Sequence, residues 1–265
     1  MRDQVTRDGA LAFDDVGSGR PVVLLHAFPL ARAMWRPQLD ALQADHRVVA
    51  PDLRGFGGSV GFRDAPGVDR LADDAAALLD ELGIREPAVV GGLSMGGYVA
   101  LAFARRHAGR LRGLILADTR AEADDAEGRA NRDKLIAFAR DHTARDVAEQ
   151  MLPKLIGPET AAHRPQVADE VRHIASEQSP AGVVGALKAL RDRPDATPGL
   201  AAIRVPTLVL VGRDDAITPR ATAEAMARRI PRATLAEIPG AGHLSNLEQP
   251  ERFNAAVRAF LHDLP

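Results

Sequence analysis

The sequence predicts an α/β protein with a mostly parallel, doubly wound sheet and a helical insertion. Two observations favour this fold class: short apolar runs alternate with helical patterns, and a long stretch in the second half of the chain contains no strand pattern. Short apolar runs without polar alternation are typical of strands buried on both faces of a parallel sheet. Strands that alternate with helices indicate a doubly wound architecture.

The apolar runs are spread along most of the chain. We expect strands at Val22–Leu25, Val48–Ala50, Ala88–Val90, Leu114–Ala117 and Thr207–Val211. Helical patterns follow in "RLADDAAALLDELGI", in "GYVALAFARRH" and in the C-terminal segment that begins at Pro250. The start, "VTRDGALAFDDVGSGRP", contains Asp-Gly and Gly-Ser-Gly turn signals and predicts an antiparallel hairpin at the edge of the sheet.

The region between the fourth and fifth predicted strands breaks this alternation. It contains amphipathic pieces such as "NRDKLIAFARDH", "DVAEQMLPKLI" and "VGALKALRDR", separated by proline and glycine. We therefore predict a core formed by residues 1–118 and 200–265, with a helical cap of residues 119–199 inserted at the edge of the sheet.

Composition excludes several classes of function. The 265 residues carry 34 Lys and Arg against 36 Asp and Glu, and this net charge of −2 argues against an electrostatic nucleic-acid binder. No apolar run approaches the ~20 residues of a membrane helix. The polar start, "MRDQVTRDGA", lacks the apolar core of a signal peptide, so we expect a cytoplasmic protein. Because the chain has no cysteine, disulfides, thiolate metal sites and a cysteine nucleophile are excluded.

The segment "GGLSMGG" places Ser94 in a G-x-S-x-G pattern between a predicted strand and a predicted helix. This context is typical of a nucleophile elbow, in which the serine projects from a sharp strand-to-helix turn and glycines two residues away avoid collisions. The helix that follows directs its N-terminal amides at an oxyanion formed there. A glycine-rich turn that only packs closely remains the alternative. A phosphate loop is excluded, because Gly-Lys-Ser/Thr is absent.

Two downstream segments contain the residues that such a serine needs. "GRDDAITP" places acids at the carboxyl end of a predicted strand, where α/β sheets carry their chemistry, and "IPGAGHLSNLEQPERF" places His243 in a loop before the last helix. An imidazole activates a serine hydroxyl, and a carboxylate fixes its tautomer and stabilises its charged form. The chain order Ser, Asp, His is the order expected with this elbow.

Along nearly its whole length the chain resembles the α/β-hydrolase family. The blocks "HAFPL", "DLRGFGGS", "GLSMGG", "VPTLVLVGRDDAITP" and "GAGHLSNLEQPE" stand in the order of that family. It is most similar to small esterases and 3-oxoadipate enol-lactonases, with cofactor-free haloperoxidases (perhydrolases) close by. The resemblance implies an α/β-hydrolase fold, with Ser94 as the nucleophile, His243 as the general base and Asp215 as the residue that orients it.

Two further acids compete with Asp215 for this role. In the family the acid stands three residues after the glycine that closes the strand and four before a proline, and Gly212 and Pro219 select Asp215 by that spacing. Asp214 then becomes a turn residue. Asp118 remains a further candidate, because some members carry the acid after the preceding strand.

The oxyanion hole is expected to use two backbone N–H groups. Met95, the residue after the nucleophile, supplies the first donor, and the resemblance implies Phe28 as the second. The family usually has His-Gly in that loop, whereas this chain has His26-Ala27, and alanine adopts fewer backbone conformations than glycine. We expect His26 to support the loop rather than to take part in catalysis.

These residues predict a carboxylic ester hydrolase acting on a small or medium ester or lactone, with no metal or organic cofactor. Phe138 and Leu152 in the cap are expected to contact the substrate. Cap arginines such as Arg129, Arg132 and Arg140 are interpreted as solvated, with a grip on a substrate carboxylate as the alternative. Perhydrolysis by the same triad, and a receptor-like protein that retains the fold to bind a ligand, stay open.

Overall fold

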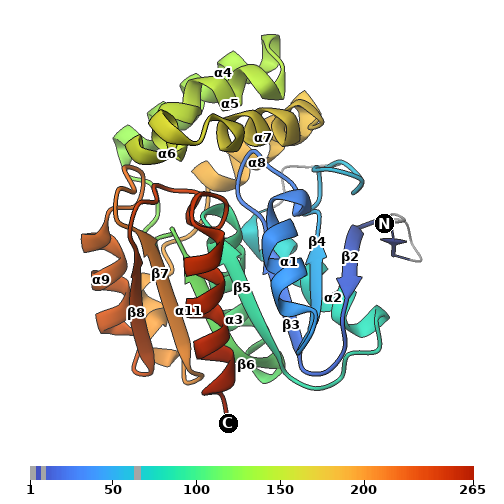
Figure 1. The fold of residues 1–265 in the computed structure, drawn as a ribbon. Coiled ribbons are helices and arrows are strands. Elements are labelled where there is room, and N and C mark those ends of the chain that lie inside the picture. Colours follow the sequence, from blue (N-terminus) through green and yellow to red (C-terminus); the bar gives the residue numbers. More distant parts are fainter. Residues whose placement is uncertain (1–3, 7–9, 63–66) are drawn as a thin grey trace.

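In the computed structural model, residues 4–6, 10–62 and 67–265 are described. They contain an eight-stranded sheet in the order β1-β2-β4-β3-β5-β6-β7-β8 (Figure 1). The strands are β1 Gln4–Val5, β2 Ala12–Val16, β3 Pro21–Leu25, β4 Arg47–Pro51, β5 Ala88–Leu93, β6 Leu111–Ala117, β7 Thr207–Gly212 and β8 Ala233–Ile238. Strands β3 to β8 pair in parallel, and only β1 with β2 and β2 with β4 pair in antiparallel fashion.

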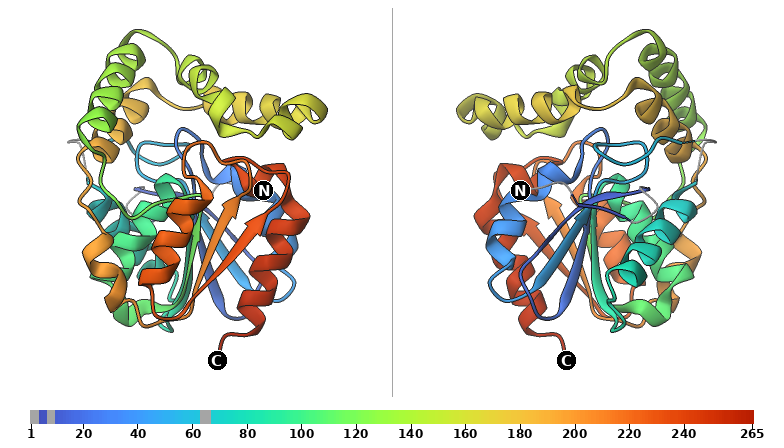
Figure 2. Two further views of the ribbon diagram at one scale, coloured as in Figure 1. Left: turned by 90° about the vertical axis from the view of Figure 1, so that its left-hand side faces the viewer. Right: turned by 90° about the vertical axis from the view of Figure 1, so that its right-hand side faces the viewer.

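Helices cover both faces of the sheet, as the doubly wound prediction requires (Figure 2). One face packs against α1 Arg36–Leu42 and α11 Pro250–His262. The other packs against α2 Val68–Glu81, α3 Met95–Arg106 and α9 Arg220–Arg229. The β3, β5, β6 and β7 residues between these layers are buried throughout except for Arg112, which explains why their sequences read as continuous apolar runs.

The helical insert lies between β6 and β7 and arches over the carboxyl ends of the parallel strands (Figures 1 and 2). Its helices are α4 Ala126–Asp141, α5 Ala144–Leu155, α6 Pro158–His163, α7 Pro165–Ser176 and α8 Pro180–Arg191. Polar caps fix several starts: Asp125 accepts from Gly128 N–H before α4, Thr143 and Asp146 form a capping box at α5, and Ser179 accepts from Gly182 N–H before α8. The return to β7 runs through the 3₁₀ helix η3 Thr197–Ala202.

The predicted strands are confirmed, and one strand was missed. Strand β8 has the mixed sequence "ATLAEI" and is only partly buried, because it lies at the open edge of the sheet. It therefore lacks the continuous apolar run by which the other parallel strands were recognised. The predicted N-terminal hairpin corresponds to the antiparallel pair β1 and β2, and its Asp8-Gly9 segment lies outside the described residues.

Short 3₁₀ segments, η1 Arg32–Trp35 and η2 Ala108–Arg110, and the short helix α10 Ser245–Glu248 complete the described elements. No helix in the described part of the chain is both long and apolar enough to cross a membrane.

The turn from β5 into α3 explains the glycine-rich segment. A Cβ atom at Gly92 would overlap the backbone of Gly96, and one at Gly96 would overlap the carbonyl of Leu25 in β3. A Cβ at Gly97 would lie 2.5 Å from the Thr119 side chain. The glycines thus allow the start of α3 to approach the strand ends more closely than any side chain permits, as the elbow interpretation predicted.

We expect Gly96→Ala to lower the free energy of unfolding by about 3 kcal/mol, because the added methyl must displace the backbone of a buried strand. Gly109→Ala is the matched control, since a Cβ there has no heavy atom within 4 Å and the change should stay within about 0.5 kcal/mol. Urea unfolding of both variants measures the difference. Equal stability of the two variants would show that α3 does not need this approach.

Candidate active site

Ser94 sits at the turn between β5 and α3 with backbone angles φ 53° and ψ −110°. This positive φ is unusual for a residue with a side chain. The surrounding backbone holds it: Ser94 N–H donates to the carbonyl of Ala117, and the Ser94 carbonyl accepts from Gly97 N–H and from the Thr119 hydroxyl. The side chain remains only partly buried, so its hydroxyl is available at the carboxyl end of the sheet.

His243 links the serine to a carboxylate. Its Nε2 lies 2.8 Å from Ser94 Oγ, and its Nδ1 lies 2.9 Å from Asp215 Oδ2. With Nδ1 protonated and donating to the carboxylate, Nε2 is free to accept the serine proton. The structure thus brings together three residues that the sequence analysis identified in three separate segments of the chain.

The Asp215 carboxylate is held as an anion by several donors. Its Oδ1 accepts from the backbone N–H groups of Ile217 and Thr218 at 2.8 and 2.9 Å, and its Oδ2 accepts from the Thr218 hydroxyl at 2.5 Å as well as from His243. Burial pushes the pKa of Asp215 upward, but the hydrogen bonds and charge of His243 and the Thr218 donors outweigh it and hold the pKa below its usual value. Sequence reasoning missed Thr218, although "DAIT" places a hydroxyl three residues after the acid.

The two competing acids occupy other environments. Asp214 is exposed, and its backbone N–H donates to the Ala241 carbonyl, so it forms part of the turn. Asp118 is completely buried at the end of β6, where it accepts hydrogen bonds from Gly212 N–H and pairs with the Ser245 hydroxyl. Neither makes a hydrogen bond with His243 in the described structure. The geometry therefore places Asp215, and neither neighbour, beside the imidazole.

Burial raises the pKa of Asp118 well above its ordinary value, and the nearby negative charge of Asp215 raises it further. Hydrogen bonds from Ser245 and Gly212 oppose this shift without cancelling it. Two buried carboxyl groups that interact with each other thus have opposite tendencies: the pKa of Asp215 is lowered, and the pKa of Asp118 is raised.

Glu248 fixes the loop that carries His243, and sequence reasoning missed it. Its Oε1 accepts from the backbone N–H groups of Gly242 and Leu244, the two neighbours of the histidine, at 2.9 and 3.2 Å. Its Oε2 accepts from Gly157 N–H at 2.7 Å, at the start of α6 in the helical insert. One fully buried carboxylate therefore joins the histidine loop to the insert. Its only signal in the sequence is its place in the block "GAGHLSNLEQPE".

The two expected oxyanion donors lie at the ends of β3 and β5. Among the described residues, Phe28 N–H has no hydrogen-bond acceptor, and Met95 N–H, at the first position of α3, has none within its helix. His26 is completely buried, donates from Nδ1 to the Ala27 carbonyl and accepts from Leu53 N–H at Nε2. Burial lowers the pKa of His26, so it remains a neutral support for this loop.

The predicted cap residues are placed differently from one another. Phe138 is half-buried on α4 and lines a cavity of about 430 Å³, whereas Leu152 is buried in the packing between α5 and the core and lines neither cavity described below. Arg132 pairs with Asp124 at 3.1 Å, Arg129 donates to the Asp124 carbonyl, and Arg140 is exposed outside both cavities. The direct contact of Phe138 and Leu152 with substrate stays a prediction.

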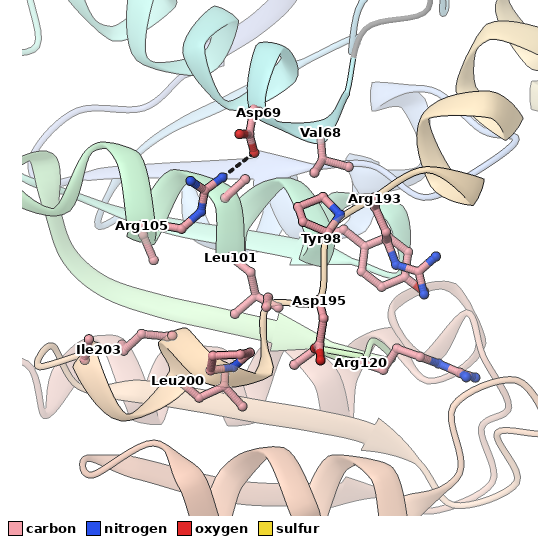
Figure 3. A pocket seen from close by; sticks show the side chains of 18 of the residues that line it. Val68, Asp69, Tyr98, Leu101, Arg105, Arg120, Arg193, Asp195, Leu200 and Ile203 are labelled. Atoms are coloured by element: carbon pink, nitrogen blue, oxygen red, sulfur yellow. Dashed lines mark hydrogen bonds and ion pairs between the residues drawn. The ribbon is translucent and has the colours of Figure 1, made fainter. Parts of the chain in front are cut away.

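A second cavity, of about 550 Å³, lies beside α3, between α2 and η3 (Figure 3). Its lining is largely apolar, and its charged side chains are engaged: Arg105 pairs with Asp69, and Arg193 pairs with Asp124 and lies 4.2 Å from the centre of the Tyr98 ring. None of the three residues of the serine site lines it.

Within the described ranges, no group of three or more His, Asp or Glu side chains is arranged to hold a metal ion.

We expect Asp118→Asn to gain stability relative to the unaltered protein as the pH rises. The pKa of Asp118 is higher in the folded protein than its unfolded value of about 3.9. Protonation of Asp118 therefore stabilises the fold below a pH of about 3.9, and this contribution is lost as the pH rises through the folded pKa. Asparagine carries no such proton, so the variant does not lose this contribution. Each tenfold difference in proton affinity corresponds to about 1.4 kcal/mol. Unfolding free energies between pH 4 and 8 measure the effect, with the exposed Asp214→Asn as the control. A difference between Asp118→Asn and the unaltered protein that does not change with pH would contradict a raised pKa.

Comparison with known proteins identifies the family of this chain. A thermophilic esterase from Thermogutta terrifontis superposes with a TM-score of 0.93 at 46% identity, covering 96% of this chain and 93% of that one. 3-Oxoadipate enol-lactonase 2 of Acinetobacter baylyi is 30% identical over 98% of this chain and 97% of its own length, and a non-heme haloperoxidase of Rhodococcus erythropolis is 31% identical over 94% of each. The model of the alpha/beta hydrolase family matches residues 22–256. The chain therefore belongs to the alpha/beta hydrolase family.

Proposed function

We propose that this protein is a serine hydrolase that cleaves small or medium carboxylic esters or lactones. The observation that carries this proposal is the continuous series of contacts from Ser94 Oγ through His243 to Asp215. Such a series makes a hydroxyl nucleophilic near neutral pH, because the imidazole takes the proton as the oxygen attacks. The similarity to an esterase and to an enol-lactonase supports the choice of substrate.

In the acylation step, Ser94 Oγ attacks the carbonyl carbon and its proton passes to His243 Nε2. The tetrahedral intermediate then collapses, the bond to the alcohol oxygen breaks, and the imidazolium returns the proton to that oxygen. For an ester the alcohol departs, whereas for a lactone it remains attached to the acyl chain. A water molecule, deprotonated by His243, then attacks the acyl-enzyme. The bond between the acyl carbon and Ser94 Oγ breaks, the imidazolium returns its proton to that oxygen, and the acid is released.

Asp215 has two tasks in this scheme. Its hydrogen bond to Nδ1 keeps the imidazole in the tautomer that exposes the Nε2 lone pair, and its negative charge stabilises the imidazolium. Both tasks require an ionised carboxylate. The lowered pKa of Asp215, which the His243 and Thr218 donors maintain against burial, meets that requirement.

The oxyanion is the remaining charge to be stabilised. Phe28 N–H and Met95 N–H are the donors we assign to it, since Phe28 lies in the loop that follows β3, Met95 directly follows the serine, and the described backbone uses neither N–H group. The N-terminus of α3 adds the positive end of its helix dipole at the same place. Removal of one such donor typically costs ~10²–10³-fold in turnover.

The same residues would support perhydrolysis as a second candidate. If hydrogen peroxide replaces water as the acceptor, deacylation yields a peracid and no change to the triad is needed. The similarity to a non-heme haloperoxidase favours testing this reaction. Peracid formation from acetate and peroxide measures it alongside ester hydrolysis.

The proposal predicts turnover of p-nitrophenyl acetate and butyrate and covalent labelling of Ser94 by a fluorophosphonate. Ser94→Ala should lose both while retaining its melting temperature, because the elbow hydroxyl contributes little to packing. Ser176→Ala, at the exposed end of α7, is the matched control and should retain both. Peptide mapping by mass spectrometry locates the label. Ester turnover that persists in Ser94→Ala, or a label on another residue, would refute the proposal.

A further inference from the structure

The cavity of about 430 Å³ lies between α4, α5 and the loop that follows β7. Its lining residues are Asn131, Lys134, Leu135, Phe138, Gln150, Met151, Lys154 and Ile217. Ile217 donates its backbone N–H to Asp215 Oδ1, so one wall of the cavity belongs to the loop that carries the acid of the triad. None of Ser94, His243 and Asp215 lines the cavity itself, so a ligand there would lie between the helical insert and the loop that carries Asp215.

The two charged residues that line this cavity, Lys134 and Lys154, are both cations. Lys134, Lys154 and Lys188 are the only lysines in a sequence whose other cationic side chains are arginine and histidine, and two of the three line this one cavity. No acidic side chain lines it. In the part of the chain that the structure describes, neither Lys134 nor Lys154 forms an ion pair.

Acids that stand close to these lysines in the sequence are paired with other residues. Asp133 binds Arg191 of α8 at 2.6 Å, and Glu149 binds Arg172 of α7 at 2.7 Å. These two acids are thus engaged by arginines, and no ion pair joins an acid of the described residues to Lys134 or Lys154. This differs from the cavity of Figure 3, where Arg105 and Arg193 pair with aspartates.

The rest of the lining defines what such a ligand must look like. Leu135, Phe138, Met151 and Ile217 offer apolar surface, which favours a hydrocarbon chain over a compact inorganic anion. Two ammonium groups favour a negative charge on the same ligand. We propose that Lys134 and Lys154 select acyl groups that carry a second, ionised carboxylate, such as half-esters of dicarboxylic acids or lactones with a carboxylate side chain. This inference rests on the proposed ester hydrolase function.

Matched substrates test this selection. Mono-p-nitrophenyl glutarate and p-nitrophenyl valerate have acyl chains of equal length and differ in the terminal group. The double variant Lys134→Gln/Lys154→Gln should lower the ratio of kcat/KM for the anionic ester to that for the neutral ester by about fivefold, the size expected for two solvent-exposed ion pairs. Added NaCl should lower the same ratio in the unaltered protein.

Two variants serve as controls for charge and position. Lys134→Arg/Lys154→Arg should keep most of the ratio, because the charges remain. Lys188→Gln, which removes the third lysine from α8 outside the cavity, should leave the ratio unchanged. A ratio that the double glutamine variant does not alter would overturn the proposal.

Binding of glutarate, measured by calorimetry or by NMR, separates this proposal from the hydrolase function. If neither ester is hydrolysed but glutarate binding weakens in the double glutamine variant, the hydrolase function fails and the anion site stands. If the neutral ester is hydrolysed but glutarate binds equally to both proteins, the anion site fails and the hydrolase function stands.

Discussion

The close approach of α3 to the ends of β3 and β5 is the constraint on which the site depends. Glycines at 92 and 96 remove the side chains that would prevent it, and Ser94 between them has a positive φ. Two consequences follow from this one turn. The Ser94 side chain stays only partly buried at the carboxyl edge of the sheet, and Met95 N–H at the start of α3 has no partner within its helix. An elbow without these glycines would lose the proposed nucleophile and a proposed oxyanion donor together.

The partners of the serine come from loops, and loops need their own restraints. Glu248 supplies one for the histidine, since it binds the backbone on both sides of His243 and ties that loop to the insert through Gly157. Thr218 supplies another for Asp215, by donating from its hydroxyl and its backbone N–H. Both restraints are buried hydrogen bonds to carboxyl oxygens. The loops therefore present a fixed geometry although they lie outside the sheet.

Much of this arrangement was predictable from the sequence, for local reasons. Strands buried on both faces appear as apolar runs, and the spacing of Gly92, Ser94 and Gly96 follows from the tightness of the elbow. What could not be predicted depends on contacts between distant segments. Strand β8 is half-exposed and lacks an apolar run, and the buried environment of Asp118 becomes visible only when β6, β7 and α10 are brought together. That the arginines of the insert, and not Lys134 or Lys154, pair with Asp133 and Glu149 among the described residues is likewise visible only in the folded structure.

The most direct test of the Ser94, His243 and Asp215 unit compares kcat for ester hydrolysis in Asp215→Asn and Asp214→Asn. Both variants remove one carboxylate with little change of shape, but only the first removes the acceptor of His243 Nδ1. Our account predicts a fall in kcat of about 10³–10⁴-fold for Asp215→Asn and little change for Asp214→Asn, at similar melting temperatures. Equal activity of the two variants, or a comparable loss in both, would contradict it.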